Sequence, residues 1–455
     1  MAAHDSWSGR TGFLLATIGS AVGIGSIWKF PYELGANGGA GFLLFYLLGL
    51  VGAVVPLMFA EFAIGRRGRG DPVTSLGAVS AEFGAARGWR IAGAIGVLTG
   101  FLILSFYSVI AGWTLGFAVQ AAGGGPGPLS ADAARGHFEA FLAAPLPMLA
   151  CHSLFMLATA LIVGRGVARG IEAASKVLMP LLAALMIGLV AYAALEGDLP
   201  AALRFLFAFD PARITARTVI EALGLGFFSI GVGMGLMITY SAYAGPQVPL
   251  VQVALLSVAT DTAISLLAGL AVFPIVFAHG LDPASGPGLV FVTLPLAFAR
   301  MPMGAPVAVA FFLLLFVAAL ASAISMLEVV VAMLSRRCRW SRARATTIAA
   351  ATCFAAGIPT LLSFNLWAGW HPLAGVPGFA QATLYDLIDE LTSNVLLPLG
   401  GLAIAVFAGW ALPARALAAE LGLSPAAAAM LRAALRYVAP AAITLAALAP
   451  VLLGR

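Results

Sequence analysis

Long apolar stretches alternate along the chain with short polar or Gly/Pro-rich breaks. A helix needs about 20 mainly apolar residues to cross the hydrocarbon core of a membrane, and about eleven stretches meet that requirement. None alternates apolar and polar residues as a half-buried strand does. The pattern predicts an all-α integral membrane protein with spans at residues 11–36, 40–65, 89–121, 146–164, 170–194, 218–243, 247–278, 304–335, 343–364, 382–410 and 428–453.

Composition supports a membrane location. Of the 455 residues, 62% are apolar and only 9% are charged, which excludes an ordinary soluble domain. The spans leave no room for a separate soluble part, so we expect a single membrane domain over residues 1–455. The first residues, MAAHDSWSGR, lack the apolar core and cleavage site of a signal peptide, so the first span should be retained.

The positive charge is concentrated in short loops. The formal net charge is +5, and arginines gather after the second, fourth and eighth predicted spans, at 66–69, 165–169 and 336–344. Basic loops remain on the cytoplasmic side of a membrane. We therefore expect a multi-pass protein of the bacterial cytoplasmic membrane, with its N-terminus in the cytoplasm, its C-terminus outside and no nucleic-acid partner.

Two spans are interrupted by glycines at corresponding positions. The sequence GSAVGIG covers Gly19–Gly25 in the first span, and GVGMG covers Gly231–Gly235 in the sixth. Unpaired backbone is costly in hydrocarbon unless it lines a cavity or ligand site, so paired breaks indicate a transport site. They predict two inverted five-helix repeats, 11–194 and 218–410, followed by an additional span at 428–453. Close helix packing through small residues is the alternative explanation.

Several long motifs occur in an order that resembles the neurotransmitter:sodium symporters, the LeuT-type transporters. The stretch GSAVGIGSIWKFPYELGANGGAGFLLFY begins at Gly19, and PLMFAEFAIGR, GWTLGF and FFSIGVGMGLMITYSAY follow at Pro56, Gly112 and Phe227. GLVFVTLPLAF at Gly288 and LYDLIDELTSNVLLPLGG at Leu384 resemble the bacterial, eleven-span branch. The resemblance implies a LeuT-type fold with discontinuous spans 1 and 6, and transport by alternating access.

By this resemblance, the chain carries an α-amino acid. Amides near Ile24 and Gly25 and the Tyr107 hydroxyl would bind its carboxylate, and the Ala21 and Phe228 carbonyls would face its ammonium group. Gly23 stands where monoamine carriers have aspartate, which argues against an amine substrate. The mainly apolar pocket implies a bulky aliphatic or aromatic L-amino acid as substrate. The expected substrate-binding residues are Ala21, Gly23, Ile24, Gly25, Ile103, Tyr107, Phe228, Ser229, Gly231, Met234, Ser322 and Met326.

The resemblance also implies one or two sodium ions held by oxygen atoms. The first ion would be bound by Ala21, Ser26, Ser229 and Asp261, and the second by Gly19, Val22, Ala318 and Ser322. Ser26 replaces the usual asparagine, and Ala321 replaces a threonine of the second site. Asp261 stands where chloride-dependent relatives have asparagine, and Leu225 replaces a chloride-site glutamine, so chloride is not expected.

Gating residues follow from the same comparison. Lys29 and Asp389 would form the outer charged pair, Tyr107 and Phe228 the aromatic lid, and Trp7 the inner plug. Arg336 falls where an acid is expected, so the usual inner ion pair is predicted to be absent. Glu61 and Glu328 lie within spans, where we expect them to tether helices through hydrogen bonds.

Three function classes are compatible with a polytopic membrane protein: a secondary transporter, an ion channel and a membrane-embedded enzyme. The paired breaks favour a sodium-coupled symporter, while Ser26, Ala321 and Asp261 leave a sodium-independent or proton-coupled carrier or exchanger open. An ion channel ranks below both, because no repeated filter loop occurs. A membrane enzyme is not expected, since the histidines show no ligand spacing and no nucleophile set is evident. A homodimer is left open.

Overall fold

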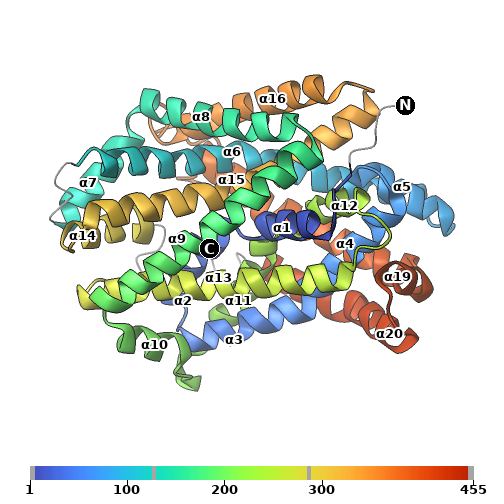
Figure 1. The fold of residues 1–455 in the computed structure, drawn as a ribbon, viewed down its shortest axis with the longest axis horizontal. Helices are drawn as coiled ribbons and strands as arrows, with labels where there is room; N and C mark the ends of the chain where they lie inside the picture. Colours follow the sequence, from blue (N-terminus) through green and yellow to red (C-terminus); the bar gives the residue numbers. More distant parts are fainter. Residues whose placement is uncertain (1–5, 125–129, 284–287, 449–455) are drawn as a thin grey trace.

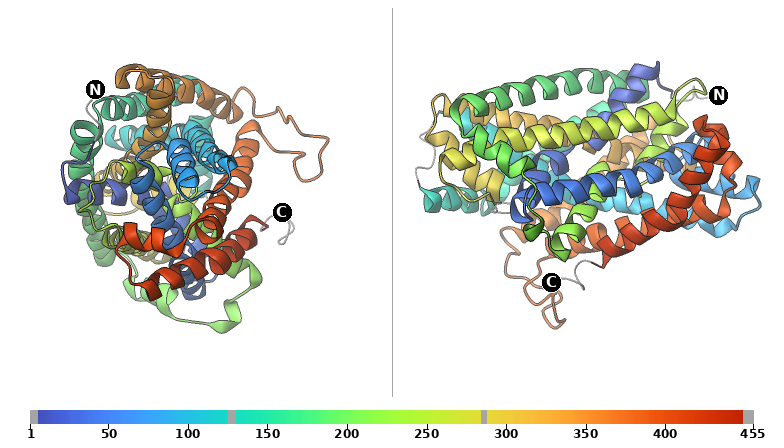
Figure 2. Two further views of the ribbon diagram at one scale, coloured as in Figure 1. Left: turned by 90° about the vertical axis from the view of Figure 1, so that its right-hand side faces the viewer. Right: turned by 90° about the horizontal axis from the view of Figure 1, so that it is seen from below.

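The structure is a computed structural model that describes residues 6–124, 130–283 and 288–448. Its described residues form helices and connecting turns, with no strand among them. Nine helices within this part are long and apolar enough to cross a membrane, and a bent helix pair makes a tenth. The long helices run along a common direction, as the two views at right angles show (Figures 1 and 2). The predicted all-α membrane fold is confirmed.

The helices follow one another without intervening sheets. Some are continued by π-helical turns, which are included in the spans given below. The α-helices are α1 Arg10–Ala21, α2 Phe30–Ala36, α3 Ala40–Gly49, α4 Val55–Gly68, α5 Pro72–Glu82, α6 Arg90–Ala122, α7 Ala131–Leu142, α8 Pro145–Gly164, α9 Ala173–Glu196, α10 Leu199–Phe207, α11 Ala216–Ile230, α12 Leu236–Ala242, α13 Leu250–Ala278, α14 Leu294–Ala299, α15 Gly304–Arg337, α16 Arg342–Ser363, α17 Leu384–Asp389, α18 Leu397–Val406, α19 Ala414–Leu421, α20 Pro425–Ala433 and α21 Ala439–Ala447.

The observed spans lie close to the predicted ones. The continuous spans are Ala40–Gly68, Arg87–Ala122, Pro145–Gly164, Val167–Glu196, Leu250–Ala278, Gly304–Arg337, Arg342–Ser363, Leu384–Ala411 and Pro425–Ala447. Residues 449–453 of the last predicted span lie outside the described residues. The short helices α5, α7, α10, α14 and α19 lie between the predicted spans, where the sequence analysis expected only loops.

The first span is broken where its glycines are. Helix α1 ends at Ala21, the chain is extended at Val22 (φ −78°, ψ 108°), and helical structure resumes as a π-helical turn at Gly25–Lys29 that leads into α2. The two parts are bent by 50°. This break leaves carbonyls at the end of α1 and amides at the start of the next segment without partners inside a helix.

The sixth predicted span is broken too. Helix α11 ends at Ile230 and α12 begins at Leu236. Gly231, Gly233 and Gly235 between them have φ values of +70°, +95° and +73°. Only glycine adopts this left-handed region without a steric penalty, so the three glycines are what allow the break. Both discontinuities expected from the sequence are present.

Helices α6 and α15 form the centre of the bundle and pack against one another. Helices α1 and α12 lie beside α15, and α12 also packs against α4 and α5 (Figure 1). Helix α9 crosses the bundle diagonally, and most of its side chains, like those of α21, face outward. Arginines 66, 67, 69, 336 and 337 gather at one end of the molecule, where the Arg336 guanidinium donates to the Arg69 carbonyl. We call this the arginine-rich end.

Candidate substrate and sodium site

A small chamber lies between the two broken spans. Its volume is about 40 Å³, and both breaks contribute to its wall together with α6 and α15. The lining residues are Ser20, Gly23, Ile24, Gly25, Ile103, Tyr107, Phe228, Ser229, Gly231, Met234, Leu236, Ser322 and Met326. Every expected substrate-binding residue except Ala21 lines this chamber. Ala21 is buried at the end of α1, and Ser20 and Leu236 are additions that the sequence analysis missed.

One side of the chamber carries polar groups. The Tyr107 hydroxyl lies 3.3 Å from the Ile24 amide nitrogen, which donates to it. A Cβ atom at Gly23 would lie 2.6 Å from the Ser322 Oγ and 3.3 Å from the Tyr107 hydroxyl. A side chain at position 23 is therefore excluded by the neighbouring hydroxyls. The backbone amide of Ile24 and the phenol together form a polar site suited to a carboxylate.

The opposite side is apolar. Ile103, Met234, Met326 and Phe228 supply carbon and sulfur surface. A Cβ atom at Gly231 would lie 2.5 Å from the Met234 Cε, so the thioether already fills the space that a side chain there would need. Methionine adapts its shape through three rotatable bonds, so this wall can be remodelled around an apolar side chain.

Three of the four residues expected at the first sodium site, Ser26, Ser229 and Asp261, lie together. The Asp261 carboxylate accepts hydrogen bonds from the Ser26 hydroxyl, from Ser229 (3.2 Å) and from Tyr46 (3.3 Å). The two serine hydroxyls are 3.1 Å apart. Asp261 has no exposed surface. A fully buried carboxylate surrounded by hydroxyls is a suitable oxygen cluster for a hard cation such as sodium.

The second set of oxygens lies between α1 and α15. The Ser322 hydroxyl is 3.4 Å from the Gly19 carbonyl oxygen and 3.2 Å from that of Val22. Ala318 is buried one turn before Ser322 on the same helix. The Ala321 methyl faces Gly19, since a Cβ atom added at Gly19 would lie 3.3 Å from the Ala321 Cβ. A hydroxyl at position 321 would thus point toward α1, but the alanine of this chain supplies none.

A larger cavity lies outside the chamber. It has a volume of about 410 Å³ and is lined by Lys29, Glu33, Glu221, Glu390 and Phe228 among others. Phe228 borders both this cavity and the chamber, so its ring separates the two. The Lys29 ammonium lies 4.6 Å from the centre of the Phe228 ring. The Asp389 carboxylate accepts instead from Ser393, so the expected outer pair is not formed in the described structure.

The arginine-rich end is closed by Trp7. Its indole Nε1 donates to the Tyr240 carbonyl at 2.8 Å, and its ring packs on Phe13 and Tyr240. Trp7 is nearly buried although it lies just before the first helix. Its role as an inner plug stays a prediction.

A buried ion pair that the sequence analysis did not predict joins α15 to α16. Glu328 of α15, fully buried, pairs with Arg342 of α16 (Nη2 to Oε2, 2.5 Å). Tyr243, next to α12, donates to the Glu328 Oε1 at 2.8 Å. The Arg342 Nε also donates to the Val163 carbonyl at the end of α8. Glu328 thus tethers helices, as expected, and does so partly through a charged partner that the sequence analysis missed.

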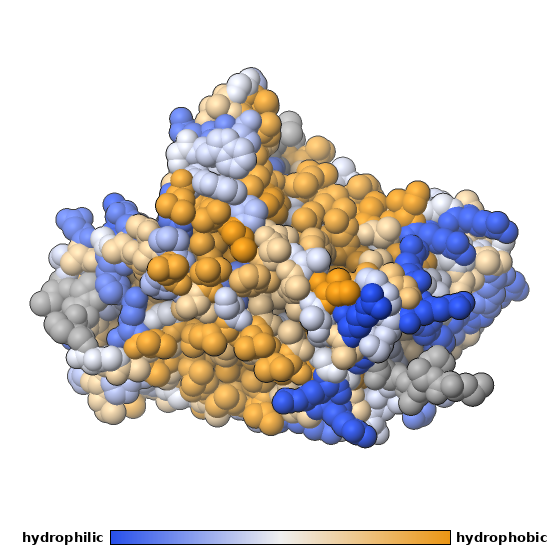
Figure 3. Space-filling model, turned by 90° about the horizontal axis from the view of Figure 1, so that it is seen from above, coloured by the Kyte–Doolittle hydropathy of each residue, from blue (hydrophilic) through white to orange (hydrophobic). Residues whose placement is uncertain are grey.

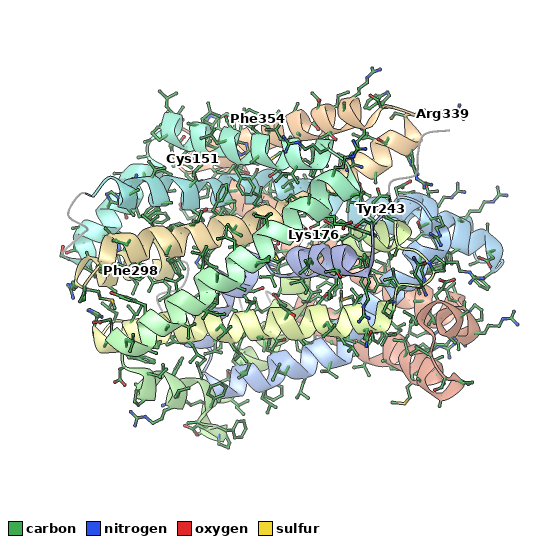
Figure 4. The ribbon with its side chains drawn as sticks, viewed as in Figure 1. Cys151, Lys176, Tyr243, Phe298, Arg339 and Phe354 are labelled. Carbon is green, nitrogen blue, oxygen red and sulfur yellow. The ribbon has the colours of Figure 1, made fainter. Side chains whose placement is uncertain are left out.

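Glu61 and Glu172 are two further buried carboxylates, and each accepts a hydrogen bond from a backbone amide of a distant segment. The Glu61 Oε1 accepts from the Gly233 amide at 2.6 Å and so fixes the break between α11 and α12. Glu172 accepts from the Ser8 amide (2.8 Å), the Ser8 hydroxyl and Lys176 (2.6 Å). Lys176 lies on α9 above α1 (Figure 4). The sequence analysis did not predict the contact between Glu172 and Ser8, because the two residues are 164 positions apart in the chain.

Comparison with known proteins identifies the class to which this architecture belongs. The model of the sodium:neurotransmitter symporter family matches residues 4–123 and 145–385. The chain belongs to this family. The sodium-dependent transporter YhdH of Bacillus subtilis is 36% identical over 401 residues, covering 88% of this chain and 86% of that protein. A sodium-dependent transporter of Haemophilus influenzae is 32% identical and covers 90% of both chains.

A solved member of the sodium:neurotransmitter symporter family has the same fold. The crystal structure of MhsT in complex with L-phenylalanine superposes with a TM-score of 0.88 at 41% identity, covering 98% of this chain and 99% of that one. The LeuT-type fold inferred from the motifs is therefore confirmed. This chain is a multi-pass membrane transporter of a sodium-dependent family, not an enzyme.

Proposed function

We propose that this protein is a secondary active transporter that imports a bulky aliphatic or aromatic L-amino acid together with sodium. The observation that carries the proposal is the chamber between the two breaks, which is polar beside Tyr107 and apolar beside Met234 and Met326. An amino acid has the same two-sided character. The L-phenylalanine bound by the related MhsT supports a hydrophobic substrate for this chain.

Two oxygen clusters support coupling to sodium. The cluster at Asp261 borders the substrate chamber through Ser229, so a substrate carboxylate in the chamber would be close to an ion there. The cluster at Ser322 joins α1 to α15, so an ion there would hold the first break against the bundle. The Asp261 carboxylate, next to Tyr46 and Ser229, supplies the negative charge that chloride would otherwise provide, which supports chloride independence.

The arrangement also supports alternating access. The closed, arginine-rich end is cytoplasmic by the positive-inside rule, and the cavity beyond Phe228 then opens to the outside. The paired breaks support two inverted repeats, 11–194 and 218–410. Substrate would enter past Phe228, be enclosed by the chamber and leave once Trp7 and its neighbours separate.

Uptake into proteoliposomes tests this function. Labelled phenylalanine or leucine should accumulate above equilibrium with an inward sodium gradient, and not with choline, whether chloride or gluconate is the anion. Asp261→Asn should abolish accumulation, because the buried cluster then lacks its charge. Accumulation independent of sodium, or equal competition by glycine and glutamate, would contradict the proposal.

A proton-coupled carrier is the second candidate, favoured by the complete burial of Asp261 among three hydroxyl groups. The same vesicles distinguish it. Uptake driven by an imposed pH gradient without sodium, and lost in Asp261→Asn, would identify this carboxyl group as the proton carrier.

A further inference from the structure

A groove on the outer surface of the bundle, between α8 and α16, has no role in the transport site. It has a volume of about 680 Å³, and carbon atoms make up most of its wall. Met156, Leu157 and Leu161 line one side, and Ala350, Ala351 and Phe354 line the other. Figure 3 shows the face of the molecule that carries α8 and α16, with a broad apolar surface and charged groups gathered toward the arginine-rich end. The groove therefore faces hydrocarbon.

The length of the groove matches one leaflet of a membrane. It extends on α8 from Ser153 to Gly164 and on α16 from Ala343 to Phe354. At 1.5 Å per residue, each wall is about 16 Å long, whereas half of a hydrocarbon core is about 15 Å thick. Phe354 stacks on His152 at the deep end, with ring centres 4.6 Å apart, and lies between the two helices (Figure 4).

The mouth of the groove carries a positive charge. Arg165, which follows the last residue of α8, lines it and is exposed. Among the described residues, Arg165 forms no ion pair and no side-chain hydrogen bond, unlike Arg66, Arg67 and Arg342, which pair with glutamates. An unpaired guanidinium at the end of an apolar groove can bind a phosphate through two hydrogen bonds.

We propose that this groove is a binding site for one anionic phospholipid of the inner leaflet. An acyl chain lies between α8 and α16, and the phosphate binds Arg165. The Val163 carbonyl, just before this mouth, is the one that Arg342 contacts, so a bound lipid would stabilise the same end of α8 that the Glu328–Arg342 pair holds.

Native mass spectrometry of the detergent-purified chain tests the site. Phosphatidylglycerol and phosphatidylcholine with identical acyl chains are titrated separately. Arg165→Ala should weaken phosphatidylglycerol binding about fivefold and leave phosphatidylcholine unchanged, as expected for one interfacial cation. Arg344→Ala is the matched control, because Arg344 is exposed at the same end but packs on Trp340 outside the groove.

A second pair of variants tests the hydrocarbon part. Ala351→Trp fills the groove from an exposed position and should remove bound lipid of both kinds, whereas Ala184→Trp, exposed on α9, should not. Equal phosphatidylglycerol binding by Arg165→Ala and Arg344→Ala would overturn the proposal. So would an Ala351→Trp variant that keeps its lipid and instead loses a dimer, since a second copy would then cover the groove.

Discussion

Tyr107 is the residue that we propose to bind the substrate carboxylate most directly. Its hydroxyl is held beside the Ile24 amide at the break, within the polar side of the chamber. Tyr107→Phe keeps the ring but removes the donor. A hydrogen bond to a charged group contributes about 1.5–3 kcal/mol, so we expect substrate affinity to fall about 10- to 100-fold.

Equilibrium binding of labelled phenylalanine in detergent measures this loss. The control is Tyr192→Phe, whose hydroxyl contacts the Pro302 carbonyl away from the chamber. A Tyr107→Phe protein that binds as tightly as the parent would exclude the phenol from carboxylate recognition.

Ala321 offers a gain-of-function test. Its methyl faces Gly19 across the interface between α1 and α15, beside the Ser322 oxygen cluster. Ala321→Thr adds a hydroxyl at this interface. We expect the apparent affinity for sodium to rise severalfold. One more oxygen ligand should contribute about as much as one hydrogen bond, about 1 kcal/mol.

Sodium-dependent stabilisation against heat is the measurement, because an ion that binds only the folded state raises the melting temperature with concentration. Ala321→Val reproduces the shape of threonine without its oxygen and should leave the sodium response unchanged. If both variants shift the response equally, packing and not coordination is responsible.

At the scale of elements, the break between α11 and α12 depends on backbone conformation. Gly231 has a φ of +70°, and a Cβ atom there would collide with the Met234 Cε. Gly231→Ala should destabilise the protein by about 1–2 kcal/mol through the left-handed backbone alone. It should also weaken binding of phenylalanine more than binding of a smaller apolar amino acid, because Met234 is displaced into the chamber.

Melting temperature and a competition series report these two effects. Gly188→Ala on α9 is the control, since a Cβ atom there meets nothing within 4 Å, and an alanine within a helix is favourable. Equal behaviour of the two variants would show that the break tolerates a side chain.

The sequence predicted elements better than their contacts. Apolar length located the spans to within a few residues, and glycine clusters located both breaks, because these signals are local. The motifs placed Tyr107, Met234 and Ser322 at one chamber correctly. The Glu328–Arg342 pair was not predicted, because the family motif assigns the inner ion pair to position 336 and not to position 342. The contact between Ser8 and Glu172 was missed because no local pattern reports a pairing between distant segments.

At the scale of the whole molecule, the two contacts of Glu328 have different roles. The ion pair with Arg342 joins α15 to α16, and the hydrogen bond from Tyr243 joins α15 to the segment that follows α12. Arg342→Ala leaves a buried charge without its cation and should cost about 3–5 kcal/mol of stability. Tyr243→Phe should cost far less, but should loosen α12 from the bundle.

Hydrogen exchange distinguishes these outcomes. In Tyr243→Phe, peptides covering α12 and the start of α1 should exchange faster, while those from α16 remain as in the parent. Tyr437→Phe, on an exposed surface, is the control. Faster exchange throughout the protein in Tyr243→Phe would show that the phenol supports global stability instead of closure.

The position of Phe228 has a consequence for the direction of traffic. Phe228 borders both the outer cavity and the chamber, so a movement of its ring changes the volume of both spaces. A second solute waiting in the outer cavity would occupy the space into which the ring must swing before an enclosed molecule can escape backward. The rate at which enclosed substrate returns to the outside would then fall as the outside concentration rises. A larger fraction of the enclosed molecules would therefore be released into the cell.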